Sequence, residues 1–166
     1  MIIIKKIPRK HLSDIENISE DDKLIRIIKG IYLIENYYRN TFLRVCEYIF
    51  LVLNFLLNKV FGITIKNLTV GHFQLGITSI LTYYGYQSFD IHAKWIKAIS
   101  FKQLICILKG IKWKNNLEIC VWKIEPLFYQ LLLKNSHIDS LSGNIGEYYN
   151  GKMSYGFLLQ RLVYEI

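Results

Sequence analysis

Residues 22–35 read DKLIRIIKGIYLIE, and this stretch decides the fold class. Leu24, Ile28 and Ile31 recur at helical spacing behind an acidic first turn, which predicts an amphipathic helix. Glu35 continues the same apolar stripe, because it follows Leu24 at i+11. The helix therefore carries a carboxylate into a hydrophobic surface. Burial disfavours the ionised form of a carboxylate and raises its pKa, which is what a general acid near neutral pH requires.

The remainder of the chain also favours helices. The helix that carries Glu35 is expected over residues 21–38, and a second one from Thr41 to about Val60. Further helices are expected at 77–84, 88–100, 101–109, 115–135 and 155–164. The Ser-, Gly- and Asn-containing run 139–146 is expected to be a loop.

Residues 63–70 alternate and are rich in β-branched side chains, which predicts a short strand region before a tight loop bracketed by Gly71 and Gly76. The predicted fold class is mostly α, with a small irregular β element near residues 63–70. We expect one domain over residues 1–166, with residues 1–20 as an N-terminal extension.

Composition narrows the classes of protein further. The chain has 166 residues, of which 52% are hydrophobic and 20% charged, so disorder, collagen-like repeats and a heptad coiled coil are poor fits. The net charge of +8 favours an anionic partner such as nucleic acid, acidic lipid or cell wall. The abundance of Lys, Ile and Asn resembles the codon bias of an AT-rich genome, which weakens the charge as evidence.

The nearest approach to a membrane span is the apolar run 42–58. Its uncharged part, from Tyr48 to Asn58, is far shorter than the ~20 residues that a span needs. We therefore predict a buried central helix and no transmembrane span, while membrane-surface binding stays open.

Lysines concentrate between residues 94 and 123, where seven of them surround Trp95, Trp113 and Trp122 with Glu118 as the one acid. This basic segment could contact anionic glycan, stem-peptide carboxylates or nucleic acid, or could be the solvated faces of ordinary helices.

The cysteines and the N-terminus carry weaker signals. Cys46, Cys106 and Cys120 lie far apart among apolar residues, which predicts buried free thiols, no metal site and no cofactor. The first ten residues place apolar residues before the charges, so we expect no secretory signal.

Two further motifs accompany Glu35. Gly71-His-Phe-Gln74 places a glutamine among Phe and Leu, where a buried amide must find polar partners in a ligand or in the loop itself. Tyr148-Tyr149-Asn150 offers flat apolar area with donors and acceptors, a combination suited to sugar rings. Taken singly, each has an ordinary structural explanation: Glu35 could pair with Arg39 or Arg44, and Gln74 could simply stabilise a turn.

The order of these motifs resembles the lytic transglycosylase and goose-type lysozyme superfamily, in which a Glu-Ser pair is followed by Gly-Leu-Met-Gln and later by Ala-Tyr-Asn. The matching residues here are Glu35-Asn36, Gly71-His-Phe-Gln74 and Tyr148-Tyr149-Asn150. The departures are Asn36 in place of serine, His72-Phe73 in place of Leu-Met, and a long separation between the first two motifs.

The resemblance implies a lysozyme-like helical domain and cleavage of the β-1,4 bond between N-acetylmuramic acid and N-acetylglucosamine in peptidoglycan, with Glu35 as acid and then base. Gly71, Phe73 and Gln74 would line the sugar cleft, and Asn150 would contact the N-acetyl group. Tyr149 would support Glu35, or Tyr148 if the register slips by one. Supporting roles would fall to Arg39, Glu47 and Tyr155. Glu47 is expected to be an ion-pair partner that orients the site, and the alternative is that it supplies the second carboxylate of a hydrolytic, muramidase-type enzyme.

The same resemblance implies action at the bacterial cell wall, in the periplasm, with glycan strands as the partner. Without a secretory signal, the chain would be made in the cytoplasm or delivered by a secretion or phage route, and an immunity or delivery protein could be a further partner. The alternative from another class is a non-catalytic basic helical module that binds nucleic acid or a membrane surface; nucleic acid is not the first choice.

Overall fold

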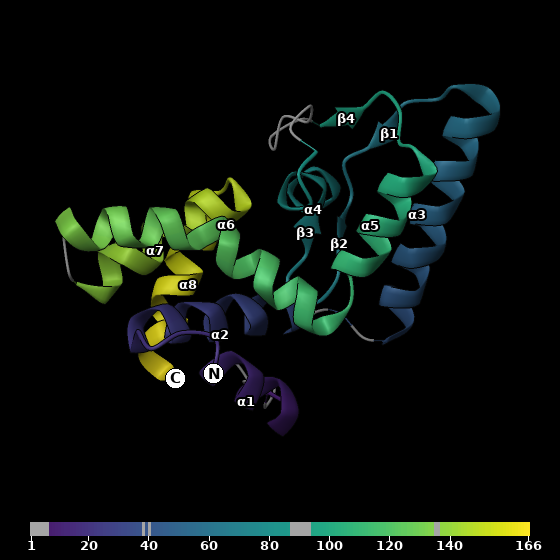
Figure 1. The fold of residues 1–166 in the computed structure, drawn as a ribbon. Coiled ribbons are helices and arrows are strands. Elements are labelled where there is room, and N and C mark those ends of the chain that lie inside the picture. Colours follow the sequence, from purple (N-terminus) through teal and green to yellow (C-terminus); the bar gives the residue numbers. More distant parts are fainter. Residues whose placement is uncertain (1–6, 38, 40, 87–93, 135–136) are drawn as a thin grey trace. The chain divides into compact units, whose positions relative to one another are not determined.

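The computed structural model describes residues 7–37, 39, 41–86, 94–134 and 137–166 (Figure 1). Within this part of the chain the fold is mostly helical with a few short antiparallel strands, as the sequence predicts. The helices are α1 (Arg9–Glu16), α2 (Asp22–Tyr37), α3 (Thr41–Phe61), α4 (Ile77–Tyr83), α5 (Phe101–Gly110), α6 (Trp113–Lys134), α7 (Ile138–Asn150) and α8 (Met153–Glu165). The strands are β1 (Ile65–Lys66), β2 (Thr69–Val70), β3 (Leu75–Gly76) and β4 (Trp95–Ile96).

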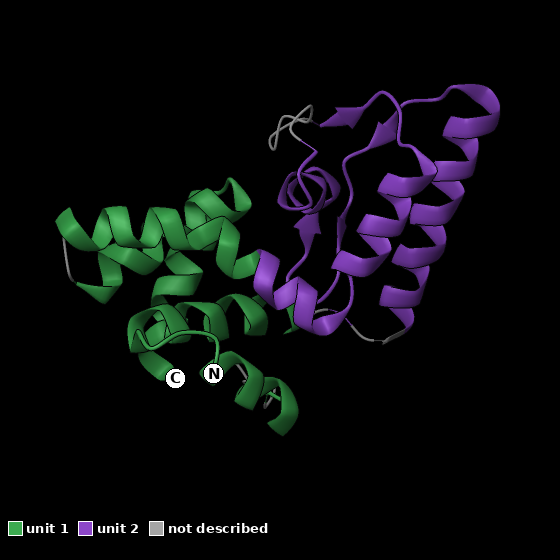
Figure 2. Ribbon diagram, in the orientation of Figure 1, with its two compact units in different colours: residues 1–38, 120–166 green, residues 39–119 purple. Residues whose placement is uncertain are grey.

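The chain divides into two compact units (Figure 2). Unit 1 combines residues 1–38 with residues 120–166, and unit 2 comprises residues 39–119. The single domain over 1–166 stays a prediction. Part of the expected N-terminal extension belongs to the body of unit 1, because α1 buries Ile15 completely and Glu16 pairs with Lys29 of α2.

Helix α2 is the core helix of unit 1, and the amphipathic pattern explains why. Its stripe residues Leu24, Ile28 and Ile31 are fully buried, and α2 packs on α8 and α7. A Cβ on Gly30 would lie 2.5 Å from Cδ1 of Leu159, so a larger residue there would require the Leu159 side chain to move. The helix predicted around the Glu35 stripe is confirmed.

The loop predicted at residues 139–146 is wrong, because these residues belong to α7. Leu141, Ile145 and Tyr149 recur every four residues and form the buried face of this helix. Glycines serve the packing of α7 on α8: a Cβ on Gly146 would lie 2.8 Å from Cα of Gly156, and a Cβ on Gly156 of α8 would lie 2.4 Å from the carbonyl oxygen of Gly143. Residues that weaken a helix in isolation are here the ones that let two helices approach closely.

The small β element of unit 2 is confirmed, although it consists of two separate pairs. Strand β1 pairs with β4, and β2 pairs with β3 around the predicted tight loop. The helix predicted at 88–100 is wrong in its second half, where β4 lies and where Ser100 caps α5. Its first half lies largely outside the described residues. Helices α4, α5 and α6 lie close to their predicted ranges.

Helix α3 also lies where it is predicted, but it is not a buried central helix. Only Leu51, Phe55 and Asn58 are buried along it, while most of its large apolar side chains are exposed. The sequence shows that α3 is apolar on most of its circumference, and cannot show how much of that circumference the rest of unit 2 covers. Among the described residues, no single helix combines the length and the apolar content needed to cross a membrane.

Candidate functional site

The carboxylate of Glu35 is held by a tyrosine from the far end of the sequence. The Tyr155 hydroxyl donates a hydrogen bond of 3.0 Å to Oε1 of Glu35. Glu35 lies in the last turns of α2 and is half-buried, and Tyr155 lies in the first turn of α8 and is buried. The packing of α2 on α8 brings the two side chains together.

Tyr149 of α7 completes an aromatic pair beside this carboxylate. Its ring stacks on that of Tyr155, with centroids 6.1 Å apart. Nζ of Lys123, from α6, lies 4.7 Å from the centroid of the Tyr149 ring and donates a 3.2 Å hydrogen bond to the Tyr149 carbonyl oxygen. The sequence places Lys123 only in the basic segment. In the structure its ammonium group points into unit 1, toward Tyr149.

Burial dominates the electrostatics of this group, which we call the Glu35 cluster: Glu35, Cys120, Lys123, Tyr149 and Tyr155. Burial raises the pKa of the Cys120 thiol to about 12, and nearby Glu35 acts in the same direction while Lys123 opposes it. Burial lowers the pKa of Lys123, opposed by Cys120 and Glu35. Cys120 is therefore a neutral thiol at neutral pH, which makes it a poor nucleophile.

Both tyrosines of the cluster stay protonated. Burial and then the charge of Glu35 raise the pKa of Tyr155, and burial raises the pKa of Tyr149 well above its ordinary value. A phenol that keeps its proton is a permanent hydrogen-bond donor. Tyr155 can therefore orient the Glu35 carboxylate at any pH at which the protein is folded.

The third motif is split by the geometry of α7. Tyr149 faces into unit 1, whereas Tyr148 and Asn150 on either side of it are exposed. Gly151 then ends α7 in the left-handed conformation, with φ of 76°. Tyr149, and not Tyr148, is thus the tyrosine beside Glu35, and Asn150 lies on the surface of unit 1.

The glutamine motif belongs to unit 2, and its polar groups are engaged there. Nε2 of Gln74 donates to the carbonyl oxygen of Gly71 at 2.8 Å and to Oε2 of Glu47 at 3.2 Å. Oε1 of Gln74 accepts a hydrogen bond of 2.9 Å from the Thr69 hydroxyl. Gln74 is buried at a positive φ of 48°, so these bonds fix the turn between β2 and β3. Both amide hydrogens of Gln74 are used inside the protein.

Glu47 has the ion-pair role that the sequence predicts. Its Oε1 accepts a hydrogen bond from Nη1 of Arg39, while Oε2 receives Gln74. Arg39, Glu47 and Gln74 therefore form one polar chain inside unit 2. Glu35 belongs to unit 1, so the predicted site residues fall in separate units.

Phe73 is a core residue of unit 2. It is fully buried, and its ring stacks on Trp113 with centroids 5.8 Å apart. Its backbone N–H donates to Oδ1 of Asn116 at 2.8 Å, and Nδ2 of Asn116 donates to the carbonyl oxygen of Gly110 at 2.9 Å. A Cβ on Gly71 would lie 2.5 Å from Nδ2 of Asn116, so this position needs glycine.

Asn116 is the structural residue that the sequence reading missed. Asparagine favours caps and turns, so its place at the start of the helix expected over 115–135 does not mark Asn116 as a buried residue. Asn116 instead lies inside α6, fully buried. Its position in the sequence could have indicated burial, because it lies among residues of α6 that are buried, such as Leu117 and Ile119.

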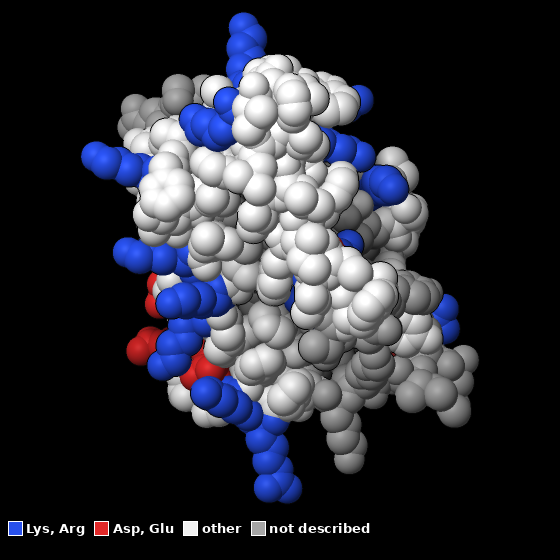
Figure 3. Space-filling view, turned by 90° about the vertical axis from the view of Figure 1, so that its right-hand side faces the viewer, with Lys and Arg blue, Asp and Glu red and all other residues white. Residues whose placement is uncertain are grey.

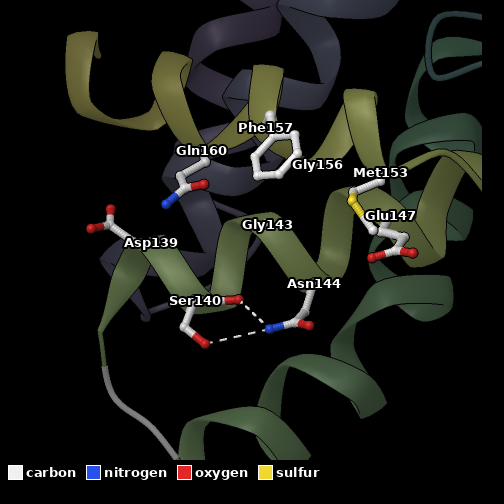
Figure 4. A pocket seen from close by; sticks show the side chains of 9 residues that line it. All are labelled: Asp139, Ser140, Gly143, Asn144, Glu147, Met153, Gly156, Phe157 and Gln160. Atoms are coloured by element: carbon white, nitrogen blue, oxygen red, sulfur yellow. Dashed lines mark hydrogen bonds between the residues drawn. The ribbon is translucent and has the colours of Figure 1, made fainter.

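A pocket of about 310 Å³ opens between α7 and α8 of unit 1 (Figure 4). Asp139 and Glu147 contribute carboxylates to its lining, and Met153 and Phe157 contribute apolar surface. None of the predicted site residues lines it. Among the described residues, no group of three or more His, Cys, Asp or Glu side chains is arranged to hold a metal ion.

Comparison with known proteins adds no relative. No family model matches the chain, and neither a curated protein nor a solved structure matches it. The residues of the Glu35 cluster are therefore the basis for its proposed chemistry.

Proposed function

We propose that the chain is a peptidoglycan-cleaving glycosidase that acts on the β-1,4 bond between N-acetylmuramic acid and N-acetylglucosamine, with Glu35 as its catalytic acid and base. The observation that carries the proposal is the hydrogen bond from Tyr155 to the half-buried Glu35 carboxylate. A carboxylate that is partly removed from water and held by a permanent donor is suited to pass a proton in a defined direction. The motif order described above supports the same substrate.

The reaction needs one carboxylate and no water. Protonated Glu35 gives its proton to the glycosidic oxygen as the bond from that oxygen to C1 of the muramic residue breaks. The Glu35 carboxylate then takes the proton of the muramic 6-hydroxyl, whose oxygen attacks C1 and closes a 1,6-anhydro ring. Glu35 ends protonated, as it began, and the glycan strand is cut without hydrolysis.

Tyr155 and Tyr149 act as positioning residues in this scheme. Tyr155 fixes Oε1 of Glu35, and Tyr149 supports the Tyr155 ring by stacking on it. Orientation of this kind contributes strongly to catalysis, because small displacements of a catalytic group cost large factors in rate. The roles of Gly71, Phe73, Gln74 and Asn150 in sugar binding stay predictions. Gln74 and Phe73 are committed to contacts inside unit 2, so the backbone of their turn is the part left to meet a glycan.

The substrate implies a place of action at the bacterial cell wall. Glycan strands are the proposed partner, and the chain would reach them through a secretion or phage route. An immunity or delivery protein is the further partner that such a route implies.

A non-catalytic basic module is the second candidate, favoured by the charge of unit 2. Within the basic segment, Lys94, Lys97, Lys102, Lys109, Lys112 and Lys114 are exposed. In this reading the Glu35 cluster is only a structural element of unit 1, and an anionic surface or nucleic acid is the ligand.

The test is digestion of purified sacculi by wild type, Glu35→Gln and Glu147→Gln. Glu147 is the matched control, because it is an exposed glutamate of unit 1 outside the cluster. We expect wild type and Glu147→Gln to release 1,6-anhydro muropeptides, identified by mass spectrometry, and Glu35→Gln to release at least about a hundredfold fewer. No release by wild type, or equal release by Glu35→Gln, would reject the glycosidase.

A further inference from the structure

Helix α3 is amphipathic, and its apolar face is the one exposed to solvent. The side chains on its inner face include Arg44, Glu47 and Asn58. Its outer face exposes eleven large apolar side chains: Phe42, Leu43, Val45, Ile49, Phe50, Val52, Leu53, Leu56, Leu57, Val60 and Phe61. Monomeric soluble proteins rarely expose a contiguous apolar patch of this extent without a binding role.

Polar contacts hold α3 in this orientation. Glu47 bonds Arg39 and Gln74 on the inner side. One turn from the end of the helix, Nδ2 of Asn58 donates to the carbonyl oxygens of Ile63 and Lys97, both at 2.8 Å. Rotating α3 to bury its apolar arc would break all of these bonds and leave their buried groups unpaired, which is costly. The outward apolar face is therefore a specified feature of unit 2.

A basic and aromatic cluster lies beside the C-terminal end of α3. Strand β1 pairs Lys66 with Trp95 of β4, and Asn58 ties the residues after β4 to the end of α3. The exposed lysines gathered here are Lys59, Lys66, Lys94 and Lys97. Trp95 is 61% exposed among them, and Phe61 is 69% exposed. Tryptophan beside lysine at the edge of an apolar surface is typical of the membrane–water interface.

The charge of unit 2 points to an anionic ligand. Residues 39–119 contain ten Lys and Arg against three Asp and Glu, a net charge of +7 out of +8 for the whole chain. Figure 3 shows a broad uncharged surface with lysine and arginine side chains along its margin, joined at one side by a few acidic ones. An apolar surface bordered by cations matches the acyl region and headgroups of an anionic bilayer.

We propose that the outer face of α3 is a docking surface for an anionic phospholipid bilayer. The helix lies in the interface plane with its apolar arc among the acyl chains and Lys59, Lys66, Lys94 and Lys97 among the headgroups. Its 21 residues extend over about 32 Å, so the helix presents a long apolar strip and not a single anchor. This proposal does not depend on the glycosidase, because it uses no residue of the Glu35 cluster.

The test is flotation of the full chain with vesicles of phosphatidylglycerol, compared with vesicles of phosphatidylcholine. The apolar variant is Phe50→Ser with Leu53→Ser, and its matched control is Tyr129→Ser with Leu133→Ser, two exposed apolar residues of α6. The charge variant is Lys94→Glu with Lys97→Glu, and its control is Lys134→Glu with Lys152→Glu, two exposed lysines of unit 1.

We expect wild type to float with phosphatidylglycerol and much less with phosphatidylcholine. The apolar variant should bind at least about tenfold more weakly, since each lost side chain removes buried apolar area. The charge variant should lose about thirtyfold or more, from about fivefold for each lysine near an anionic surface, and this difference should shrink in high salt. Both controls should bind like wild type.

Quenching of Trp95 fluorescence by brominated lipid gives a second measurement, which is made on the wild-type protein. Wild type should be quenched by brominated phosphatidylglycerol, and Trp95→Phe should lose most of that quenching. Absence of flotation and quenching overturns the proposal. So does dimerisation without vesicles that the apolar variant abolishes, because the face then binds a second copy. Glu35→Gln should float like wild type, so failure on sacculi and failure on vesicles are separate results.

Discussion

The hydroxyl of Tyr155 donates a 3.0 Å hydrogen bond to Oε1 of Glu35, joining two residues that are 120 positions apart in the sequence. This bond connects the first turn of α8 to the end of α2. Because Tyr149 stacks on Tyr155 and Lys123 lies over Tyr149, four helices contribute to the surroundings of one carboxylate.

Removal of the Tyr155 hydroxyl tests whether this bond positions Glu35. Tyr155→Phe keeps the ring and its stacking, so we expect kcat on sacculi or a soluble glycan to fall roughly 10- to 100-fold with KM almost unchanged. The free energy of unfolding should fall by about 1–3 kcal/mol, because the half-buried Glu35 side chain loses its donor. Unchanged kcat would mean that Tyr155 has a structural role alone.

The two adjacent tyrosines of α7 provide a matched pair. Tyr149→Ala removes a buried ring and should lower the free energy of unfolding by about 3–5 kcal/mol, as for other large aromatic truncations. Tyr148→Ala removes a ring that is 40% exposed and should change it by about 0.5 kcal/mol. Urea unfolding followed by circular dichroism measures both. Equal losses would contradict the assignment of Tyr149 to the interior.

Cys120 should make the protein less stable at alkaline pH. Its pKa is about 12 in the folded protein against 9.0 as the ordinary value, so above pH 9 the unfolded chain loses a proton that the folded chain keeps. The free energy of unfolding is therefore unaffected by this group below pH 9 and falls by about 1.4 kcal/mol per pH unit between pH 9 and 12.

The wild type minus Cys120→Ala difference isolates this slope from those of Lys123, Tyr149 and Tyr155. Urea unfolding at a series of pH values measures it, and a difference that stays flat above pH 9 would contradict burial of the thiol. In the folded protein a thiol reagent at pH 8 should label the exposed Cys46 and spare Cys120.

Asn116 and Asn115 test the support of the Gln74 turn in unit 2. Asn116→Ala leaves the Phe73 N–H and the Gly110 carbonyl oxygen unpaired in the interior, so the free energy of unfolding should fall by about 2–4 kcal/mol. Asn115→Ala should cost about 1 kcal/mol or less, because its bond to the Lys109 carbonyl oxygen is exposed. Thermal unfolding of both variants measures the difference. A larger loss of stability for Asn115→Ala would contradict the assignment of this support to Asn116.

The two wrong predictions about helices have one physical cause. Residues 139–146 were expected to be a loop because Ser, Gly and Asn have low helix propensity, yet Gly146 and Gly156 are what allows α7 and α8 to pack so closely. Residues 94–100 were expected to be helical, yet β4 pairs with β1, a partner some thirty residues earlier. In both places a tertiary contact outweighed a local preference.

What the sequence determined by itself is the set of patterns that depend on neighbours along the chain. The apolar period of α2 predicts the buried stripe and brings Glu35 to its end, and the glycines around residues 71–76 predict the tight turn. What only the tertiary structure decided is which face of each helix is covered. Tyr149 faces inward because α7 packs on α8, and α3 turns its apolar arc outward because Glu47 and Asn58 are bonded on its inner side. Periodicity gives a helix an apolar arc, but which arc is buried depends on partners that are distant in the sequence.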